Sequence, residues 1–363
     1  MKPQGPLKGV KVLEFVGLGP APFCAMMLAD MGCDVVRIDR PGAAGGGAAD
    51  ILARGRRSVA LNLKDEQDHR TAVALIGKTD ILLEGYRPGV MERLGLGPDT
   101  AFQANPALVY GRMTGWGQYG PLAHSAGHDI NYIALTGALH AIGTQSSPVP
   151  PLNLVGDFGG GAMYLAFGVL AALTHARSTG EGQVVDAAIV DGATSLMASQ
   201  HQLAAYGLWN TSRSNNLLDG ASHFYGVYEC SDGKHISIGP IEPEFYALLC
   251  EKIGVDAGLY PADWSGKNWS ETRQMFESIF RAKTRDQWCG LLEGTDVCFA
   301  PVLNYEESAN HPHMQDREIY ETHDGVRQAA PAPRFSRTPG AIQGPAPTPG
   351  AHTKAVLSDW GLG

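Results

Sequence analysis

The chain has 363 residues, of which 44% are hydrophobic and 18% are charged. This composition is typical of a folded globular protein with enough core for two domains, and it excludes a disordered chain. The 37 acidic residues outnumber the 28 basic ones and give a net charge of −9, which argues against nucleic acid as a partner. An anionic ligand would have to be held by a local group of Arg and Lys side chains.

Strand and helix signals alternate over the first 190 residues. Apolar runs typical of short strands lie at residues 10–15, 33–38, 80–84, 107–110 and 183–186. Such runs, spaced by helix signals such as residues 21–31, predict a parallel sheet with helices on both faces. The longest apolar run, residues 162–173, is too short to cross a membrane and predicts a buried helix. We therefore expect residues 1–190 to form a large Rossmann-like α/β domain, with no membrane as a partner.

The rest of the chain differs in character. Polar residues predict a linker at 191–223, and a β-hairpin follows with Asp232-Gly233 as its turn. With the helix signals behind it, the hairpin indicates a small α+β domain over residues 224–320. Pro and Gly crowd residues 330–349 and exclude regular structure there. We expect an arm of residues 330–363 to complete the large domain.

The six cysteines include no C-x-x-C pair, so neither a metal site nor a disulfide framework is expected. The sequence shows no secretory signal and no peroxisomal one, which predicts a cytoplasmic protein.

The turn from Gly17 to Pro22 superficially follows the G-x-G-x-x-G pattern of dinucleotide-binding folds, and Asp39 lies about 20 residues further on. Proline replaces the third glycine, however, and Asp39 is enclosed by Arg37 and Arg40. The turn therefore indicates a tight strand-to-helix connection rather than a nicotinamide dehydrogenase.

Basic side chains gather behind the expected strands. They are Arg37, Arg40, Arg54, Arg56, Arg57, Lys64, Arg87 and Arg93. In a doubly wound sheet the residues after the strands line the ligand crevice, and arginine pairs well with phosphate. Solvated surface charge is the alternative for Arg56, Arg57 and Arg93. The run Gly85 to Gly89 is a stronger indication of a ligand site. Its glycines permit close approach of the backbone to a ligand, and its tyrosine offers a flat face to a phosphorylated nucleotide.

Two segments carry candidate acid–base groups. Gly127-His128-Asp129 places an imidazole in a polar loop, and the glycine-rich run from Gly156 to Gly161 places Asp157 at an expected helix start. A neutral imidazole can accept a proton and a protonated carboxyl can supply one, so such a pair could move a proton between the two faces of one carbon. Asp157 could instead be a simple N-cap, and Glu242 a simple first-turn acid.

These residues stand in strings that resemble family III coenzyme A transferases over nearly the whole chain. The strings include Val36 to Pro41, Glu84 to Val90, Gly127 to Tyr132, Pro150 to Gly161, Gly182 to Ala187, Ile241 to Pro243 and Pro333 to Ser336. Within the family, the chain is similar to members that racemise 2-methylacyl thioesters of coenzyme A. The resemblance implies an interlocked homodimer, with each active site between the large domain of one subunit and the small domain of the other.

The resemblance also implies the site residues. His128 and Asp157 match the two catalytic acid–bases, and Asp129 and Glu242 match their supporting acids. The matches to the coenzyme A contacts are Arg40, Leu61, Asn62, Leu63, Lys64, Gly85, Tyr86, Arg87, Arg93, Gly127, Ile130, Asn131 and Tyr132. No separate cofactor and no metal are implied, because coenzyme A is part of the acyl-CoA thioester substrate.

The chemistry expected of this set is a 1,1-proton transfer. His128 would remove the α-proton of one enantiomer while protonated Asp157 supplies a proton to the opposite face of the α-carbon. Backbone N–H groups at residues 157–161 would hold the enolate oxygen. Burial would raise the pKa of Asp157. The alternative is a coenzyme A transferase in which Asp157 attacks the thioester and forms an acyl-aspartyl intermediate. A non-catalytic acyl-CoA-binding protein is a third hypothesis, disfavoured by the complete set of His128, Asp157 and Glu242.

Overall fold

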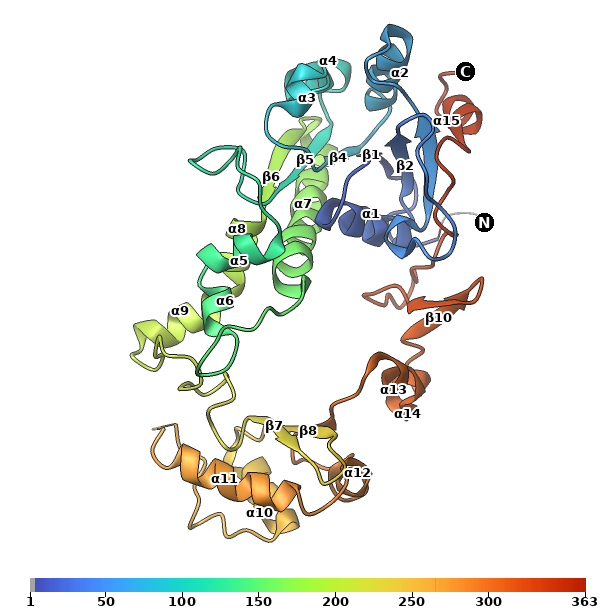
Figure 1. The fold of residues 1–363 in the computed structure, drawn as a ribbon. Helices are drawn as coiled ribbons and strands as arrows, with labels where there is room; N and C mark the ends of the chain where they lie inside the picture. The colour runs from blue at the N-terminus through green and yellow to red at the C-terminus, as the bar shows by residue number, and fades with distance from the viewer. Residues whose placement is uncertain (1–3, 265) are drawn as a thin grey trace. The chain divides into compact units, whose positions relative to one another are not determined.

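The computed structural model describes residues 4–264 and 266–363, which fall into two compact units (Figure 1). The larger unit takes the chain up to Thr136, then Leu152–Leu196 and Arg317–Gly363. The smaller unit takes Gly137–Pro151 and Met197–Asp316. The larger unit is therefore assembled from three separate stretches of the chain.

Within the described residues, the larger unit is built on a six-stranded parallel sheet in the order β3-β2-β1-β4-β5-β6. Its strands are β1 (Lys11–Phe15), β2 (Asp34–Asp39), β3 (Arg56–Ala60), β4 (Ile81–Glu84), β5 (Val109–Thr114) and β6 (Gln183–Ala188). This is the strand order of the doubly wound dinucleotide-binding fold. The expected Rossmann-like parallel sheet is confirmed, and the order reverses between β1 and β4.

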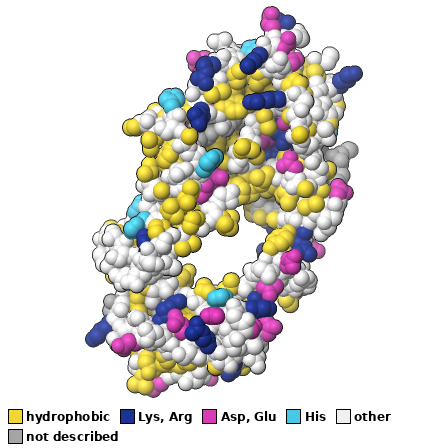
Figure 2. Space-filling view, in the orientation of Figure 1, with side chains coloured by type: hydrophobic (Ala, Val, Ile, Leu, Met, Phe, Trp, Pro, Cys, Tyr) yellow, Lys and Arg dark blue, Asp and Glu magenta, His cyan; other side chains and the backbone are white. Residues whose placement is uncertain are grey.

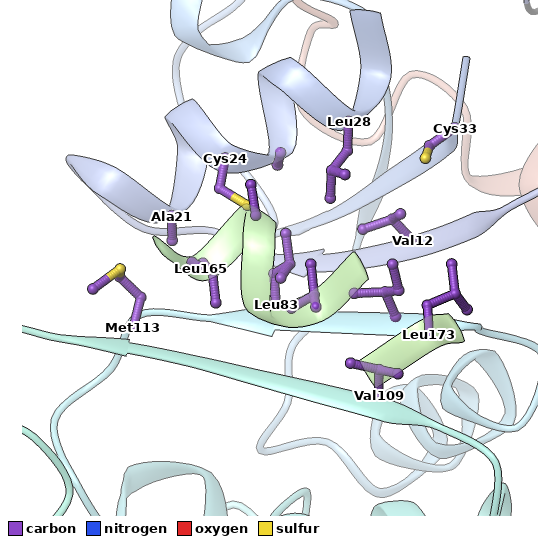
Figure 3. Packing of buried hydrophobic residues seen from close by; sticks show 14 of the residues in the cluster. Val12, Ala21, Cys24, Leu28, Cys33, Leu83, Val109, Met113, Leu165 and Leu173 are labelled. Carbon is purple, nitrogen blue, oxygen red and sulfur yellow. The ribbon is translucent and has the colours of Figure 1, made fainter. Parts of the chain in front are cut away.

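Helices cover both faces of this sheet. They are α1 (Pro20–Asp30), the 3-10 turn η1 (Ile51–Ala53), α2 (Glu66–Ile76), α3 (Val90–Arg93), α4 (Pro98–Ala104), α5 (Asp129–Leu135), the π-helix η2 (Leu154–Met163), α7 (Tyr164–Thr179), α8 (Ile189–Leu196) and α15 (Thr353–Asp359). Because side chains alternate along a strand, neighbouring residues enter different cores. Val12 packs with Leu28 of α1 and Leu165 of α7 (Figure 3), whereas Leu13 packs on the opposite face with Trp360.

The expected buried helix is confirmed as α7, which continues directly from η2. Together they form an apolar stretch, Leu154–Thr179, that is long and apolar enough to cross a membrane by length and composition alone. One face of α7, including Leu165 and Val169, is buried against the sheet. The opposite face leaves Met163 and Phe167 exposed.

Strand β3 was not expected, because Arg56 and Arg57 look like solvated charge in the sequence. Arg56 is instead buried and paired with Glu14 of β1 at 3.0 Å, and Arg57 pairs with Asp34 of β2 at 2.6 Å. The partners of both arginines lie far away in the sequence, so no local pattern could reveal them.

The C-terminal segment covers the edge of the sheet beside β3. A hairpin of β10 (Tyr320–His323) and β11 (Val326–Ala329) precedes an irregular arm. The N–H of Gly350 donates to Ser58 Oγ at 2.7 Å, and the N–H of His352 donates to Ser58 O at 3.0 Å. These bonds protect an edge strand that would otherwise present open backbone groups.

The smaller unit is α+β. It contains α6 (Ala138–Ala141), α9 (Ala198–Ala205), β7 (Gly226–Glu229), β8 (His235–Ile238), α10 (Pro243–Ile253), α11 (Trp269–Phe280), α12 (Arg285–Leu292), β9 (Phe299–Pro301), α13 (Tyr305–Asn310) and α14 (Pro312–Asp316). Strands β7, β8 and β9 form an antiparallel sheet that includes the expected hairpin. The stretch expected to be a linker, 191–223, differs from expectation in part: it holds the end of α8 and all of α9. Its residues 198–205 are mostly good helix formers.

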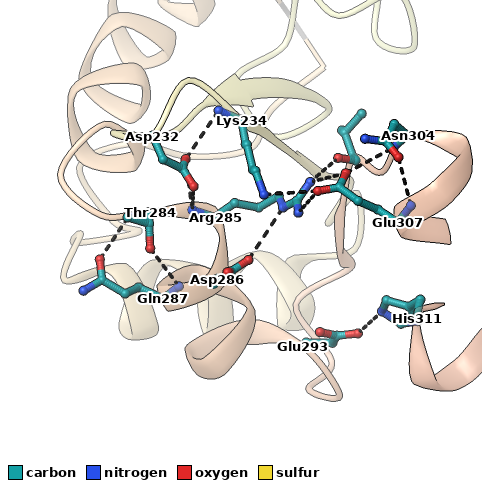
Figure 4. A network of polar contacts seen from close by, with 11 residues as sticks. Asp232, Lys234, Thr284, Arg285, Asp286, Gln287, Glu293, Asn304, Glu307 and His311 are labelled. Atoms are coloured by element: carbon teal, nitrogen blue, oxygen red, sulfur yellow. Dashed lines mark hydrogen bonds and ion pairs between the residues drawn. The ribbon is translucent and has the colours of Figure 1, made fainter.

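Ion pairs tie the helices of the smaller unit to its sheet. Arg285, at the start of α12, pairs with Glu307 of α13 at 2.7 Å, and Lys234 Nζ reaches the same carboxylate at 3.1 Å (Figure 4). The network joins the hairpin turn to segments that lie 53 and 73 residues further along the chain. It therefore holds distant parts of the smaller unit together.

We expect the smaller unit to lose stability in mild acid because of His223. Its ring is buried among Phe224, Tyr246 and Phe276, and its Nε2 lies 2.9 Å from Tyr246 Oη. Burial lowers the pKa of His223 from 6.5 to about 4, with a smaller lowering by Arg273. Between these two values the unfolded chain binds more protons, so stability falls as the pH falls from 6.5 toward 4, by at most about 1.4 kcal/mol per pH unit.

The measurement is urea unfolding of the wild type and of His223→Gln, which cannot titrate, at pH 7 and pH 5. The wild type should lose more stability between the two pH values than the variant does. Exposed His235, replaced by Gln, is the control and should leave the difference as in the wild type. Equal acid sensitivity of the wild type and His223→Gln would contradict the prediction.

Candidate active site

A crevice opens where the strand order reverses, at the carboxyl ends of β1 and β4, which is where doubly wound sheets bind ligands. One cavity there, of about 360 Å³, is lined by the loop after β4, the end of β5 and the start of α5. Its lining includes the predicted residues Gly85, Tyr86, Arg87, Gly127, His128, Asn131 and Tyr132. The structure therefore brings a large part of the predicted set to one place.

A neighbouring cavity of about 620 Å³ holds most of the remaining predicted contacts. Its lining includes Asp39, Arg40, Leu61, Asn62, Leu63, Lys64 and Tyr86, with apolar walls from Val16, Ile38, Val90 and Leu94. Tyr86 lines both cavities, so the two are adjacent. Of the predicted contact residues, Ile130 and Arg93 line neither cavity; Arg93 lies beside the turn at Gly89.

The basic side chains behind the strands divide into two groups. Arg37, Arg54, Arg56 and Arg57 are held by Asp39, Asp30, Glu14 and Asp34 respectively. The other four, Arg40, Lys64, Arg87 and Arg93, have no ion-pair partner among residues 4–264 and 266–363. Figure 2 shows Lys and Arg side chains set around hydrophobic ones on a face of the larger unit. An anionic ligand would therefore meet the second group.

The floor of the first cavity depends on two glycines. The ring of Tyr132 lies edge-on to that of Trp116, with centroids 4.7 Å apart, and its hydroxyl donates to the carbonyl of Gly127. A Cβ on Gly115 would lie 2.0 Å from the Tyr132 ring, and one on Gly127 would lie 2.8 Å from it. Glycine at both positions therefore makes room for the tyrosine that shapes the cavity beside His128.

Asp129 joins the two candidate acid–base groups. His128 precedes α5 and its backbone N–H donates to Asn131 Oδ1 at 3.0 Å; the residue is exposed and lines the first cavity. The carboxylate of the next residue, Asp129, accepts the N–H of Asp157 at 2.7 Å. A Cβ on Gly156 would lie 2.2 Å from the same carboxylate, so glycine is required there. One short bond thus ties the backbone of Asp157 to the residue that follows His128.

Asp157 has the acidity expected of a proton donor. Burial raises the pKa of its carboxyl, and the negative charge of Asp129 raises it further; a hydrogen bond from Asn153 and the positive charge of His128 oppose the rise. A half-buried carboxyl with a raised pKa, beside an exposed imidazole, is a typical acid–base pair.

The glycine-rich run does not form the helix start that we expected. Asp157 lies inside the π-helix η2, not at an N-cap. Its N–H is taken by Asp129 and that of Phe158 by Asn153 O at 3.1 Å, so these two groups are not free to hold an enolate oxygen. The expectation of an oxyanion site built from this run is wrong at these positions.

The glycines of the run serve close packing instead. A Cβ on Gly160 would lie 2.6 Å from the N of Ala193 in α8, and one on Gly192 would lie 1.8 Å from Gly160 O. Helix α8 therefore presses against η2 backbone to backbone. Wide π-helical turns often occur at functional sites, and this one carries Asp157.

The first turn of α1 contributes residues that the sequence pattern did not reveal. A Cβ on Gly19 would lie 3.4 Å from Asp157 Oδ2, and the ring of Phe23 stacks on that of Phe158 at 4.3 Å. Gly19 therefore lies beside the Asp157 carboxyl. Its positive φ of 71° fits the tight turn that the G-x-G pattern predicts, which is the only advance signal in the sequence.

Glu242 belongs to the smaller unit. It is the exposed N-cap residue of α10, but its side chain accepts no capping hydrogen bond. Its charge raises the pKa of Cys298, a neighbour in the same unit, although burial of that thiol is the larger cause. The carboxylate of Glu242 is therefore not committed to its own helix.

A doubly wound unit with an acid–base pair beside a cation-lined crevice defines an enzyme of nucleotide-bearing substrates. The model of CoA-transferase family III matches residues 7–353, and the chain belongs to this family. It is 43% identical to the α-methylacyl-CoA racemase of Mus musculus over 360 residues, which cover 98% of this chain and 93% of the mouse protein. It is 41% identical to the racemase of the same name from Homo sapiens over 362 residues, covering 98% and 94% of the two chains.

A solved structure supports the fold. The crystal structure of Rv3272 from M. tuberculosis, in its orthorhombic form, aligns with a TM-score of 0.81 at 27% identity and covers 97% of this chain and 99% of that one. The fold of this chain, the smaller unit included, is therefore similar to that of Rv3272.

Proposed function

We propose that the protein racemises 2-methylacyl thioesters of coenzyme A by moving the α-proton between His128 and Asp157 through an enolate. The observation that carries the proposal is the bond from the N–H of Asp157 to Asp129, which fixes the backbone of residue 157 beside the residue that follows His128. The identity of 41% and 43% to two proteins named α-methylacyl-CoA racemase supports the substrate class.

The proton balance of the reaction needs one base and one acid. Neutral His128 takes the α-proton, the electron pair of the C–H bond moves into the thioester as an enolate, and protonated Asp157 returns a proton to the opposite face. The reverse reaction exchanges the two roles. The raised pKa of Asp157 favours its protonated form and therefore its role as acid.

The two cavities suit the coenzyme A part of the substrate. Arg40, Lys64 and Arg87 have no ion-pair partner in the described part of the chain and are available to phosphate. The apolar walls of the larger cavity, including Leu61 and Leu63, suit a flat base. The proposal requires no resident cofactor or metal, and a cytoplasmic location goes with it.

The test is proton NMR of the wild-type enzyme with one enantiomer of a 2-methylacyl-CoA in deuterated water. Racemisation with uptake of one deuterium at the α-carbon is the expected result. The transferase alternative predicts instead an acyl-aspartyl adduct, which hydroxylamine would trap at Asp157. A hydroxamate at Asp157 without α-deuteration would refute the racemase proposal.

We further propose that two copies associate and that Glu242 of one copy supports His128 of the other. Met163 and Phe167 lie one turn apart on η2 and α7, and their side chains are 51% and 74% exposed. An apolar face of this kind on a helix is typical of a subunit interface. The unbonded carboxylate of Glu242 is consistent with a partner outside its own unit.

Replacement of Phe167 by Glu is therefore expected to convert a dimer to a monomer and to lower activity with it, because a charge cannot be buried in an apolar contact without a partner. Light scattering after size exclusion measures the mass. Leu259→Glu, at a similarly exposed apolar side chain of the smaller unit, is the control. A monomeric wild type with full activity would refute this part of the proposal.

A further inference from the structure

Asp39 lies at the nucleotide end of the sheet but takes no part in the proton transfer. It is the last residue of β2 and lines the second cavity of the crevice and a further one of about 380 Å³, whose lining includes Arg37 and Arg40. The turn at Gly19 lies about 20 residues before it, and the strand order is that of the dinucleotide-binding fold. In that fold an acidic residue at this place accepts a hydrogen bond from a ribose hydroxyl.

One oxygen of Asp39 is occupied and the other is free. Oδ2 accepts from Arg37 Nε at 3.1 Å and from Ser58 Oγ at 2.5 Å. Oδ1 has no hydrogen-bond partner within residues 4–264 and 266–363. It is also not one of the fully buried side-chain atoms of that part of the chain that lack a hydrogen-bond partner. Those atoms are Trp116 Nε1, Gln118 Nε2, His223 Nδ1 and Arg285 Nε. The free oxygen therefore opens to a cavity.

The charge of Asp39 is already balanced. Its ion pair with Arg37 is buried on both sides, so the pair is neutral as seen by an anionic ligand. Arg40, the next residue, and Lys64 line the same cavity without ion-pair partners in the described chain. The cavity thus offers two cations for phosphate and one acceptor for an N–H or O–H group.

We propose that Asp39 is a specificity-determining residue that accepts a hydrogen bond from the nucleoside of coenzyme A. The inference rests on the proposed function, which supplies the ligand. Two groups of that nucleoside can donate, the 2′-hydroxyl of the ribose and the amino group of the adenine. Both have the same chemistry toward a carboxylate, and analogues that lack one or the other distinguish them.

Asp39→Asn is the substitution that tests the acceptor role of Asp39 most directly. Arg37 Nε can only donate, so the new side-chain amide must turn its oxygen toward Arg37 and its NH₂ group toward the cavity. The variant keeps the size of the side chain, replaces the acceptor by a donor and leaves the charge of Arg37 without its ion-pair partner. Asp34→Asn is the matched control, because Asp34 is a paired carboxylate at the opposite end of β2.

The experiment measures KM and kcat for one 2-methylacyl thioester on three carriers: coenzyme A, its 2′-deoxy analogue and its inosine analogue. Asp39→Asn should raise KM for the natural carrier about tenfold or more without changing kcat, the effect of losing a hydrogen bond to a charged group. The wild type should show the same rise with the analogue that lacks the donor, and Asp39→Asn should not distinguish that analogue from the natural carrier. Asp34→Asn should behave as the wild type.

A variant that discriminates the analogues as the wild type does would overturn the proposal. So would an equal loss with a pantetheine thioester, which has no nucleoside. If Asp39→Asn does not fold, the wild type alone decides, and a KM unaffected by either analogue overturns the inference. If the wild type does not racemise the thioester, the proposed function fails separately, and the affinities for coenzyme A and the two analogues, measured by calorimetry, test Asp39 in its place.

Discussion

Replacement of His128 by Ala is expected to lower the rate of racemisation by about 10²–10⁴-fold, the usual contribution of one general acid or base. The two enantiomers should differ in how much deuterium exchange they lose. Asp157 remains beside the substrate, so the enantiomer whose α-proton faces Asp157 should still exchange it for deuterium without inversion. Proton NMR in deuterated water, run on each enantiomer separately, measures both effects.

His124→Ala is the control for this experiment. His124 is exposed in the same loop as His128 and lines neither cavity of the crevice. Its replacement should leave racemisation at the wild-type rate. Equal deuterium uptake from both enantiomers by His128→Ala would show that the imidazole is not one of the two proton carriers.

Asp157→Asn is expected to lower the rate of racemisation by the same factor, but to leave deuterium exchange in the other enantiomer. The amide cannot donate a proton to an enolate, whereas His128 can still remove a proton from its own side and return a deuteron. The turn should survive, because Asp129 bonds to the backbone N–H of residue 157 and not to its carboxyl. Circular dichroism confirms the fold, and NMR follows each enantiomer.

Asp186→Asn is the matched control for Asp157. Burial also raises the pKa of Asp186, and its carboxylate accepts the N–H of Gln118 away from the acid–base pair. Its replacement tests whether loss of another acid with a raised pKa is enough to stop the reaction. Retention of full racemisation by Asp157→Asn would refute the two-base mechanism.

The sheet could be predicted because most of its strands are buried on both faces. Runs such as 11–15 and 81–84 are continuous apolar signals that no other local structure explains as well. Strand β3 gave no such signal. Arg56 and Arg57 are neutralised by Glu14 and Asp34, and pairs across such distances are visible only in the folded chain.

The residue types of the site could be predicted, but its architecture could not. An imidazole and a carboxyl, His128 and Asp157, are recognisable as chemistry wherever they stand. The bond that brings them together runs from residue 157 to Asp129, across 28 positions. The glycines after Asp157 predicted free backbone N–H groups. In the structure they allow close packing instead, since α8 lies against them at Ala193.

The way the larger unit is distributed along the chain has a consequence for biosynthesis. Its edge strand β3 is covered by Gly350 and His352, and the bond from Gly350 to Ser58 spans 292 positions, so the cover is synthesised long after the strand. Most of the smaller unit is one uninterrupted stretch, Met197–Asp316, which can close while translation continues. The nascent larger unit therefore exposes the side of β3 until then, and a chain that stops before Gly350 should yield aggregates rather than a merely less active enzyme.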